Sequence, residues 1–125
     1  MADMHKVSSL AKTWILDLDG TVVKHNGYKI DGKDTLLAGA KEFLATLPLT
    51  DMLIFVTARK EEYRAATEAF LKENGIRYDH IIFGAPMGER ILINDKKPSG
   101  LPMSHAVNTE RDVFMQDAFV VDETL

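Results

Sequence analysis

A short apolar run that ends in two aspartates constrains this chain more than any other feature. The segment Trp14–Val22 opens with four apolar residues in five positions, the pattern of a buried strand, and carries Asp17 and Asp19 one residue apart. Two carboxylates held close together repel, and desolvation raises that cost. In an extended segment, residues i and i+2 point the same way. We therefore expect Asp17 and Asp19 to converge on one site that holds a cation or performs chemistry.

A calcium-binding loop is one alternative for such an acid pair. That motif needs further oxygen ligands and a glutamate at its twelfth position. Counted from Asp17, the twelfth residue is Tyr28. The sequence therefore argues against this kind of loop.

Composition and charge exclude several classes of protein. The 125-residue chain has a formal net charge of −4 and a pI near 5.5, which argues against nucleic acid or an anionic membrane as the main partner. It has no cysteine, so disulfides and thiol catalysis are excluded. Its longest apolar runs are about five residues, far short of the roughly 20 that span a bilayer, and the first residues lack the apolar core of a signal peptide. We expect a single-domain, cytoplasmic protein.

Strand-like and helix-like segments alternate along the chain, which favours an α/β fold with a mostly parallel central sheet. The predicted strands are Thr13–Leu18, Met52–Val56, Tyr78–Phe83, Arg90–Ile93 and, from a weaker pattern, Ala106–Asn108. The predicted helices are Thr35–Leu47, capped by Asp34, and Lys60–Asn74, ended by Asn74-Gly75. We expect a turn and a short hairpin over Gly20–Asp34, whereas Val113–Leu125 has no clear pattern.

Polar residues follow three of the predicted strands. Asp17 follows the first, Thr57 the second, and Asn94-Asp95 the fourth. In open α/β sheets, ligands bind outside the carboxyl ends of the strands, so these side chains are expected to build one site. Alone, Thr57 could simply cap the next helix, and Asn94-Asp95 could be an ordinary turn. A helix cap is itself compatible with anion binding.

The order of three motifs, DLDGTV, FVTAR and LINDKK, resembles motifs I, II and IV of the haloacid dehalogenase (HAD) superfamily. This resemblance implies a three-layer Rossmann-like fold over residues 1–125 and a magnesium-dependent phosphatase. In such an enzyme Asp17 attacks phosphorus and forms an aspartyl-phosphate, while Asp19 acts as general acid and then general base. Thr57 would donate a hydrogen bond to a phosphoryl oxygen.

The same resemblance implies a Mg²⁺ site. Its ligands would be Asp17, the backbone carbonyl of Asp19, and Asp95, with Asn94 as a direct or water-mediated helper. Oxygen ligands of this kind suit Mg²⁺, which neutralises charge on a phosphoryl group. Members of the family commonly carry Asp or Gly where this chain has Asn94, so Asp95 is the main expected ligand from motif IV.

The basic residue of motif III has no unmistakable match. Arg90, just before the predicted fourth strand, is the first candidate for this catalytic role. Lys96 and Lys97 are alternatives, although solvated positions are equally expected for them.

Further residues are expected to contact substrate. Lys97 is one of them, as are Ala58 and Arg59, which follow Thr57; the alternative for Arg59 is a surface position on the first helical turn. His25 lies in the Gly20–Asp34 connection, which forms a flap over the site in the family, so it is a further candidate.

No insertion point has room for a cap domain. Members of the HAD superfamily carry a cap either in the flap after motif I or in the linker after the third strand. Only 37 residues separate Asp19 from Thr57, and the first predicted helix uses most of the second half of that stretch. The stretch from Phe83 to Arg90 is shorter still. A capless site stays open to large substrates unless a second copy of the chain closes it, so a homo-oligomer is one expected form.

The substrate expectation rests on the resemblance alone. The LINDKKPxG ending and the short chain are similar to capless phosphatases of bacterial surface-polysaccharide metabolism, so we expect a small phosphorylated molecule such as a sugar phosphate. Two alternatives stay open: a phosphatase or phosphotransferase for a larger phosphorylated substrate, and a non-catalytic HAD-like binding module. A phospho-receiver domain is disfavoured, because the strand before Thr57 does not end in an aspartate.

Overall fold

The computed structural model describes residues 2–125, whose contacts divide the chain into two compact units. The larger unit comprises Ala11–Pro86 and Thr109–Met115. The smaller unit comprises the residues up to Leu10 together with Met87–Asn108 and Gln116–Leu125. Each unit has a sheet of its own. The expectation of one domain over residues 1–125 stays a prediction.

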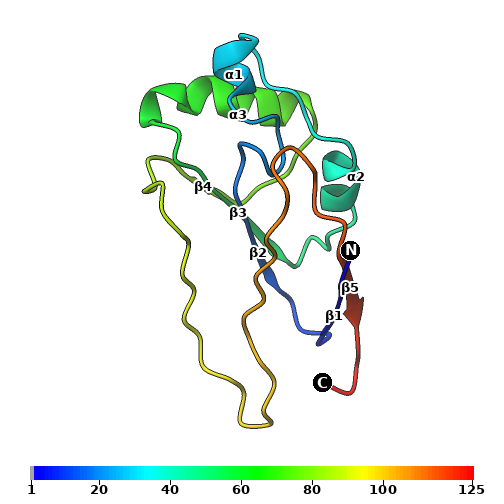
Figure 1. The fold of residues 1–125 in the computed structure, drawn as a ribbon. Helices are drawn as coiled ribbons and strands as arrows, with labels where there is room; N and C mark the ends of the chain where they lie inside the picture. Colours follow the sequence, from blue (N-terminus) through cyan, green and yellow to red (C-terminus); the bar gives the residue numbers. More distant parts are fainter. Residues whose placement is uncertain (1) are drawn as a thin grey trace. The chain divides into compact units, whose positions relative to one another are not determined.

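The larger unit is built on a parallel sheet in the order β2-β3-β4 (Figure 1). Its strands are β2 (Thr13–Leu16), β3 (Met52–Val56) and β4 (His80–Ile82). Ile54 of the central strand pairs with Ile15 on one side and with His80 on the other. The first three predicted strands and their parallel arrangement are therefore confirmed, although two strands are shorter than expected. Because the strands are parallel, their carboxyl ends lie at one edge of the sheet.

Helix α2 covers Ala40–Ala45, a shorter span than the predicted helix over residues 35–47. Gly39 precedes it with a φ of 89°, a left-handed conformation that the backbone of an α-helix cannot contain. The helix therefore begins after Gly39, and the prediction that Asp34 caps it is wrong.

Helix α3 (Arg64–Glu73) follows a 3₁₀ turn, η1 (Glu61–Tyr63), and together they confirm the predicted helix over residues 60–74. The helix ends as expected at Gly75, whose φ is 68°. The N–H of Ile76 then donates to the carbonyl of Leu71 at 2.9 Å, which closes the last turn. None of the helices within residues 2–125 is long and apolar enough to cross a membrane.

The Gly20–Asp34 connection contains a short helix, α1 (Gly27–Ile30), where a hairpin was expected. Its two ends are held together by an antiparallel bridge between Val23 and Leu36. The N–H of Lys24 also donates to the carbonyl of Thr35 at 2.9 Å. The connection is therefore a closed loop that returns to the place where it left the sheet.

The core of the larger unit is apolar and closely surrounds the turn after β2. Its most deeply buried apolar side chains, none more than 1% exposed, are Leu18, Val22, Val23, Ala40, Leu53, Phe55 and Leu71. Burying a side chain of this size contributes roughly 1.5–3 kcal/mol. Since three of these residues flank Asp19 in the sequence, burial of the apolar neighbours holds the acid-bearing turn in place.

The smaller unit is a two-stranded parallel sheet formed by β1 (Met4–Val7) and β5 (Ala118–Val121), neither of which the sequence predicted. His5 pairs with Phe119 in the register, and their rings stack with centroids 4.6 Å apart. The Nε2 atom of His5 lies 2.7 Å from the Asp117 carboxylate. A polar contact and a ring stack thus join the two ends of this unit.

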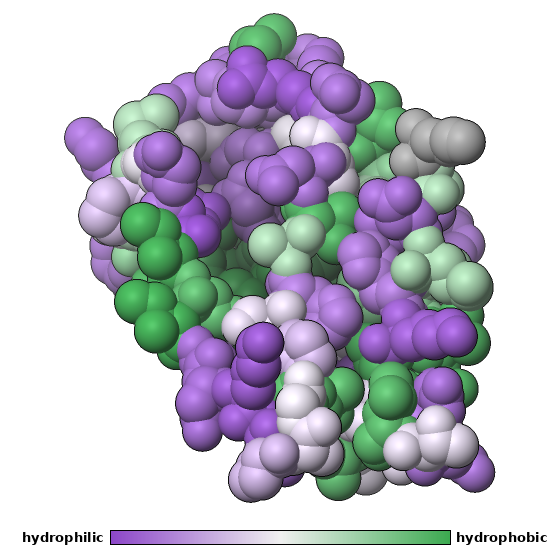
Figure 2. All heavy atoms as spheres, turned by 60° about the horizontal axis from the view of Figure 1, so that its bottom comes forward, coloured by the Kyte–Doolittle hydropathy of each residue, from purple (hydrophilic) through white to green (hydrophobic). Residues whose placement is uncertain are grey.

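Two strand predictions in the smaller unit are wrong. Within residues 2–125, neither Arg90–Ile93 nor Ala106–Asn108 belongs to a strand of either sheet. On the face shown in Figure 2, hydrophobic residues interrupt a largely hydrophilic surface. Within this unit Met87, Ile91 and Ile93 are 92%, 83% and 90% exposed. The apolar residues of these two segments are therefore not sufficient to make them strands.

Candidate functional site

Asp17 and Thr57 follow neighbouring strands at the same edge of the sheet. The register pairs Leu16 at the end of β2 with Phe55 in β3, so the sheet carries both polar residues at its carboxyl end. This confirms the predicted position of Asp17 and Thr57 on the fold. The carboxylate oxygen Oδ2 of Asp17 lies 3.4 Å from the Thr21 hydroxyl, which donates to it. Thr21 was not singled out in the sequence, although it belongs to the same DxDGT run.

Thr57 is held rigidly by the chain on either side of it. Its N–H donates to the carbonyl of Ile82 at 2.9 Å, and its own carbonyl accepts from Ala85 at 3.0 Å. Its buried hydroxyl accepts a hydrogen bond from the N–H of Arg59 at 3.1 Å. Accepting that bond leaves the hydroxyl proton available, so donation to a phosphoryl oxygen stays a prediction.

The turn that carries Asp19 is tight and depends on Gly20. Gly20 has a φ of 82°, and its N–H donates to the carbonyl of Val23 at 2.7 Å. The carbonyl of Leu18 accepts from the N–H groups of the following turn, including Val22 at 2.9 Å and Val23 at 3.1 Å. Only glycine adopts this φ without strain. The backbone therefore determines where the Asp19 side chain emerges.

Arg59 is the centre of the hydrogen-bond network in this unit. Its side chain is only 2% exposed, and it holds the Asp19 carboxylate with two parallel bonds, Nε to Oδ2 and Nη2 to Oδ1, each 3.0 Å long. Such a fork is among the strongest pairings available to a carboxylate. The predicted surface alternative for Arg59 is therefore wrong.

The rest of the Arg59 guanidinium is equally engaged. Nη1 and Nη2 donate to the two carboxylate oxygens of Asp34 at 3.0 and 2.7 Å, and Nη1 also donates to the Thr67 hydroxyl at 2.9 Å. The Tyr28 ring lies over the guanidinium, 4.0 Å from Cζ to the ring centroid. An arginine has five N–H donors, and this network uses all of them. The structure thus gives Arg59 an internal role, and its contact with a substrate stays a prediction.

Charge stabilises this arrangement. Burial acts to lower the pKa of Arg59, but hydrogen bonds and charges from Asp34 and Asp19 outweigh it and raise that pKa above its usual value. Arg59 is therefore a permanent cation between two acids. Neither Asp34 nor Thr67 was identified from the sequence as part of the site, because Asp34 matched a helix cap and Thr67 an ordinary helix position.

A turn from late in the chain packs against the acid-bearing turn. The N–H of Asp112 donates to the carbonyl of Gly20 at 2.8 Å, and the Asp112 carboxylate accepts from the N–H of His25 at 2.7 Å. A Cβ placed on Gly20 would lie 3.3 Å from Cγ of Arg111 and 3.6 Å from Cβ of His25. The structure thus places His25 beside the turn and adds Arg111 as a cation that was not identified from the sequence. Substrate contact by His25 stays a prediction.

The remaining predicted site residues have few contacts that bear on their predicted roles. Ala58 is half-buried between Thr57 and Arg59. The others belong to the smaller unit, where all of them are exposed: Arg90, Asn94, Asp95, Lys96 and Lys97. The Asn94 amide donates to the carbonyl of Asp95 at 3.0 Å. Their predicted roles beside Asp17 stay predictions.

The donor set fits a metal site only in part. Within residues 2–125 no three His, Cys, Asp or Glu side chains are grouped so that they could hold an ion. Asp17 and Asp19 are oxygen donors of the type that Mg²⁺ prefers, but the Asp19 carboxylate is held by Arg59. That leaves the backbone carbonyl of Asp19, the donor that the resemblance names, and not its side chain.

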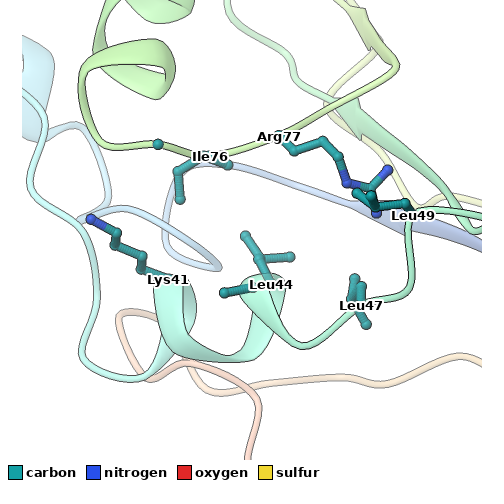
Figure 3. Close-up of a pocket in the computed structure, with 8 residues that line it drawn as sticks. Lys41, Leu44, Leu47, Leu49, Ile76 and Arg77 are labelled. Carbon is teal, nitrogen blue, oxygen red and sulfur yellow. The ribbon is translucent and has the colours of Figure 1, made fainter.

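A pocket of about 160 Å³ lies in the larger unit between α2 and the chain after α3 (Figure 3). Leu44, Leu47 and Ile76 contribute apolar side chains to its lining, and Lys41 contributes a charged one. Arg77 reaches its rim, but its guanidinium donates to the carbonyls of Asp51 and Pro48 at 3.1 Å each. None of the predicted site residues lines it, so the pocket is separate from the acid pair.

Comparisons with known proteins show two structural likenesses. No protein-family model matches the chain, and no curated protein matches it significantly. It is similar to a chain in the structure of the Pnkp1/Rnl/Hen1 complex, with 28% sequence identity and a TM-score of 0.52 over 68% of this chain and 32% of that chain. A chain in the structure of the Pnkp1/Rnl/Hen1 RNA repair complex is similar at 28% identity and a TM-score of 0.53, over 68% of this chain and 29% of that chain. The chain therefore spans about a third of the length of the chains that it resembles.

Proposed function

We propose that this chain is a phosphomonoesterase of the HAD type that removes a terminal phosphate from a larger phosphorylated substrate, such as an RNA end. The observation that carries the proposal is the position of Asp17, at the carboxyl end of a parallel strand beside Thr57 and two residues before Asp19. That edge is where open α/β sheets bind ligands. The order of the three HAD-like motifs supports the same chemistry.

Two observations favour a large substrate over the sugar phosphate that the sequence suggested. Both similar chains come from complexes that contain Pnkp1, Rnl and Hen1, one of them named as an RNA repair complex. The chain also lacks room for a cap domain over the acid pair. A net charge of −4 weakens non-specific binding to RNA, but an enzyme that acts on a terminal phosphate needs to contact only one end of the strand.

The reaction would proceed in two displacements. In the first, a carboxylate oxygen of Asp17 forms a bond to phosphorus while the bond from phosphorus to the leaving oxygen breaks, and a proton from Asp19 neutralises that oxygen. In the second, a water oxygen bonds to phosphorus, the bond to Asp17 breaks, and Asp19 takes a proton from the water. Inorganic phosphate and the dephosphorylated end are the products.

The two hydrogen bonds from Arg59 to Asp19 suit the second displacement better than the first. Asp19 accepts two hydrogen bonds from Arg59, the arrangement of an ionised carboxylate. That is the state that takes a proton from water in the second displacement. For the first displacement Asp19 must carry a proton, so we expect substrates with good leaving groups to react faster than those whose leaving oxygen needs protonation.

A Mg²⁺ ion, when bound, would neutralise charge on the phosphoryl group and relieve repulsion near Asp17. We propose Asp17, the backbone carbonyl of Asp19, and Asp95 as its ligands, with Asn94 assisting.

A phosphate-release assay tests the function. The purified chain is given a 5′-phosphorylated and a 3′-phosphorylated oligoribonucleotide, a panel of sugar phosphates, and p-nitrophenyl phosphate, with Mg²⁺ and with EDTA. We expect release from an oligoribonucleotide end in Mg²⁺ and none from the Asp17→Asn variant. Faster release from a sugar phosphate would restore the small-molecule alternative, and no release from any substrate would leave only the non-catalytic binding module.

A further inference from the structure

Asp34 is joined to Asp19 through a single guanidinium. Arg59 donates two hydrogen bonds to each carboxylate, with lengths between 2.7 and 3.0 Å. The Asp34 side chain is 6% exposed and that of Asp19 is 17% exposed. The acid at position 34 is therefore deeper than the acid whose proton the proposed reaction uses.

The contacts around Arg59 leave its guanidinium one orientation. Asp34 occupies one edge of the planar group, Thr67 takes the remaining N–H, and the Tyr28 ring covers a face. The edge that remains is the one that holds Asp19. Because a guanidinium is rigid and planar, fixing one edge fixes the other.

We propose that Asp34 is a positioning residue that sets the orientation of Asp19 by holding Arg59. This inference rests on the proposed function, since it concerns the group that exchanges protons with the leaving oxygen and the water. Without Asp34, Arg59 keeps one carboxylate partner and gains freedom to turn about its side-chain bonds. A misplacement of a catalytic group by about 1 Å can cost on the order of 10²-fold in rate.

The first test compares Asp34→Asn with Asp31→Asn. Asp31 is a matched control because it lies in the same connection and pairs with Lys24 at 2.9 Å, outside the Arg59 network. The substrates are p-nitrophenyl phosphate, whose leaving group needs little protonation, and a 5′-phosphorylated oligoribonucleotide, whose leaving oxygen needs a proton.

We expect Asp34→Asn to lower kcat on the oligoribonucleotide by about 10- to 100-fold, with a much smaller loss on p-nitrophenyl phosphate and little change in KM. Asp31→Asn should retain the wild-type ratio of the two rates. Equal losses on both substrates would overturn the inference, because a merely structural defect does not depend on the leaving group.

A second test does not need activity. The urea midpoints of Asp19→Asn, Asp34→Asn and the double variant form one cycle, and the same three changes in an Arg59→Met background form another. We expect the two acids to be coupled in the first cycle and uncoupled in the second. Absence of coupling in the presence of Arg59 would overturn the inference.

The two tests separate the inference from the function on which it rests. If the wild-type chain releases phosphate from no substrate, the proposed function fails, and the urea cycles alone decide whether Asp34 orients Asp19. If phosphate is released but the leaving-group ratio of Asp34→Asn equals that of the wild type, the function stands and the positioning role fails.

Discussion

Arg59 donates to both carboxylate oxygens of Asp19 at 3.0 Å, from a position 40 residues further along the chain. The same guanidinium donates to both oxygens of Asp34. One buried cation therefore links the acid turn after β2, the end of the connection that follows it, and the turn after β3. The second aspartate of the DxD pair is thus held by the interior of the protein while the first stays at the edge of the sheet.

Asp17→Asn should abolish phosphate release while the melting temperature stays close to that of the wild type. The amide is nearly isosteric with the carboxylate but is a poor nucleophile. The measurement is phosphate release from the best substrate, with a fresh sample so that slow deamidation does not restore the acid. Substantial turnover in such a sample would remove Asp17 from the role of nucleophile.

Arg59→Met should destabilise the fold by about 3–5 kcal/mol, because it leaves two largely buried carboxylates without their partner. Urea unfolding measures the loss. The control is Arg64→Met, since the Arg64 side chain is 38% exposed and pairs with Glu61 and Glu68 on the helix surface. Because water screens such exposed pairs, they contribute little to stability. Similar losses for both variants would contradict a special role for the Arg59 network.

The Gly20→Ala substitution should lower both the free energy of unfolding and the rate of phosphate release. The φ of 82° opposes any Cβ by roughly 1–2 kcal/mol, and the new atom would also lie 3.3 Å from Cγ of Arg111. Gly32→Ala is the matched control, because Gly32 has a φ of 72° and nothing within 4 Å of its Cβ position. We expect a comparable strain cost at Gly32 without loss of phosphate release. If the Gly20→Ala variant released phosphate at the wild-type rate, activity would not depend on the exact position of the turn that carries Asp19.

Acidification should weaken the smaller unit through Asp117. The pKa of Asp117 lies below its ordinary value of 3.8, because the N–H of Asp3 donates to the carboxylate and His5 hydrogen-bonds to it. A lowered folded-state pKa stabilises the fold above the unfolded value, and that contribution is lost as the pH falls through the folded value. Melting curves from neutral pH to below about pH 4 should therefore converge for wild type and Asp117→Asn. A constant gap between them would rule out this source of acid sensitivity.

Mg²⁺ should raise the melting temperature of the wild-type chain. A ligand at a hundredfold excess over its Kd stabilises the folded state by about 2.7 kcal/mol, which corresponds to a shift of several degrees for a domain of this size. Asp95→Ala should lose this response, and Asn94→Ala should weaken it less, because Asn94 carries no charge. The comparison is made in EDTA and in excess Mg²⁺. A wild-type chain that shows no shift and keeps phosphatase activity in EDTA would contradict the proposed metal dependence.

Local sequence patterns were sufficient for the parts of the fold that are formed by neighbouring residues. The strands at Thr13–Leu16 and Met52–Val56 follow from apolar runs, and the end of α3 follows from Gly75. Because strands that alternate with helices pair in parallel, the sequence also placed Asp17 and Thr57 at one edge of the sheet. These features depend on backbone preference and on burial of one face, which a short stretch of residues already encodes.

The tertiary structure decided the features that need distant partners. The pairing of Met4–Val7 with Ala118–Val121 joins segments far apart in the sequence. The apolar run Arg90–Ile93 belongs to neither sheet within residues 2–125. The sequence suggested that Asp34 caps a helix. The helix begins only at Ala40, because Gly39 has a left-handed conformation. The local sequence around Arg59 does not show that its side chain is buried. Arg59 can be buried only because two carboxylates, a hydroxyl and a ring from separate segments meet around it and replace the water that its charge would otherwise require.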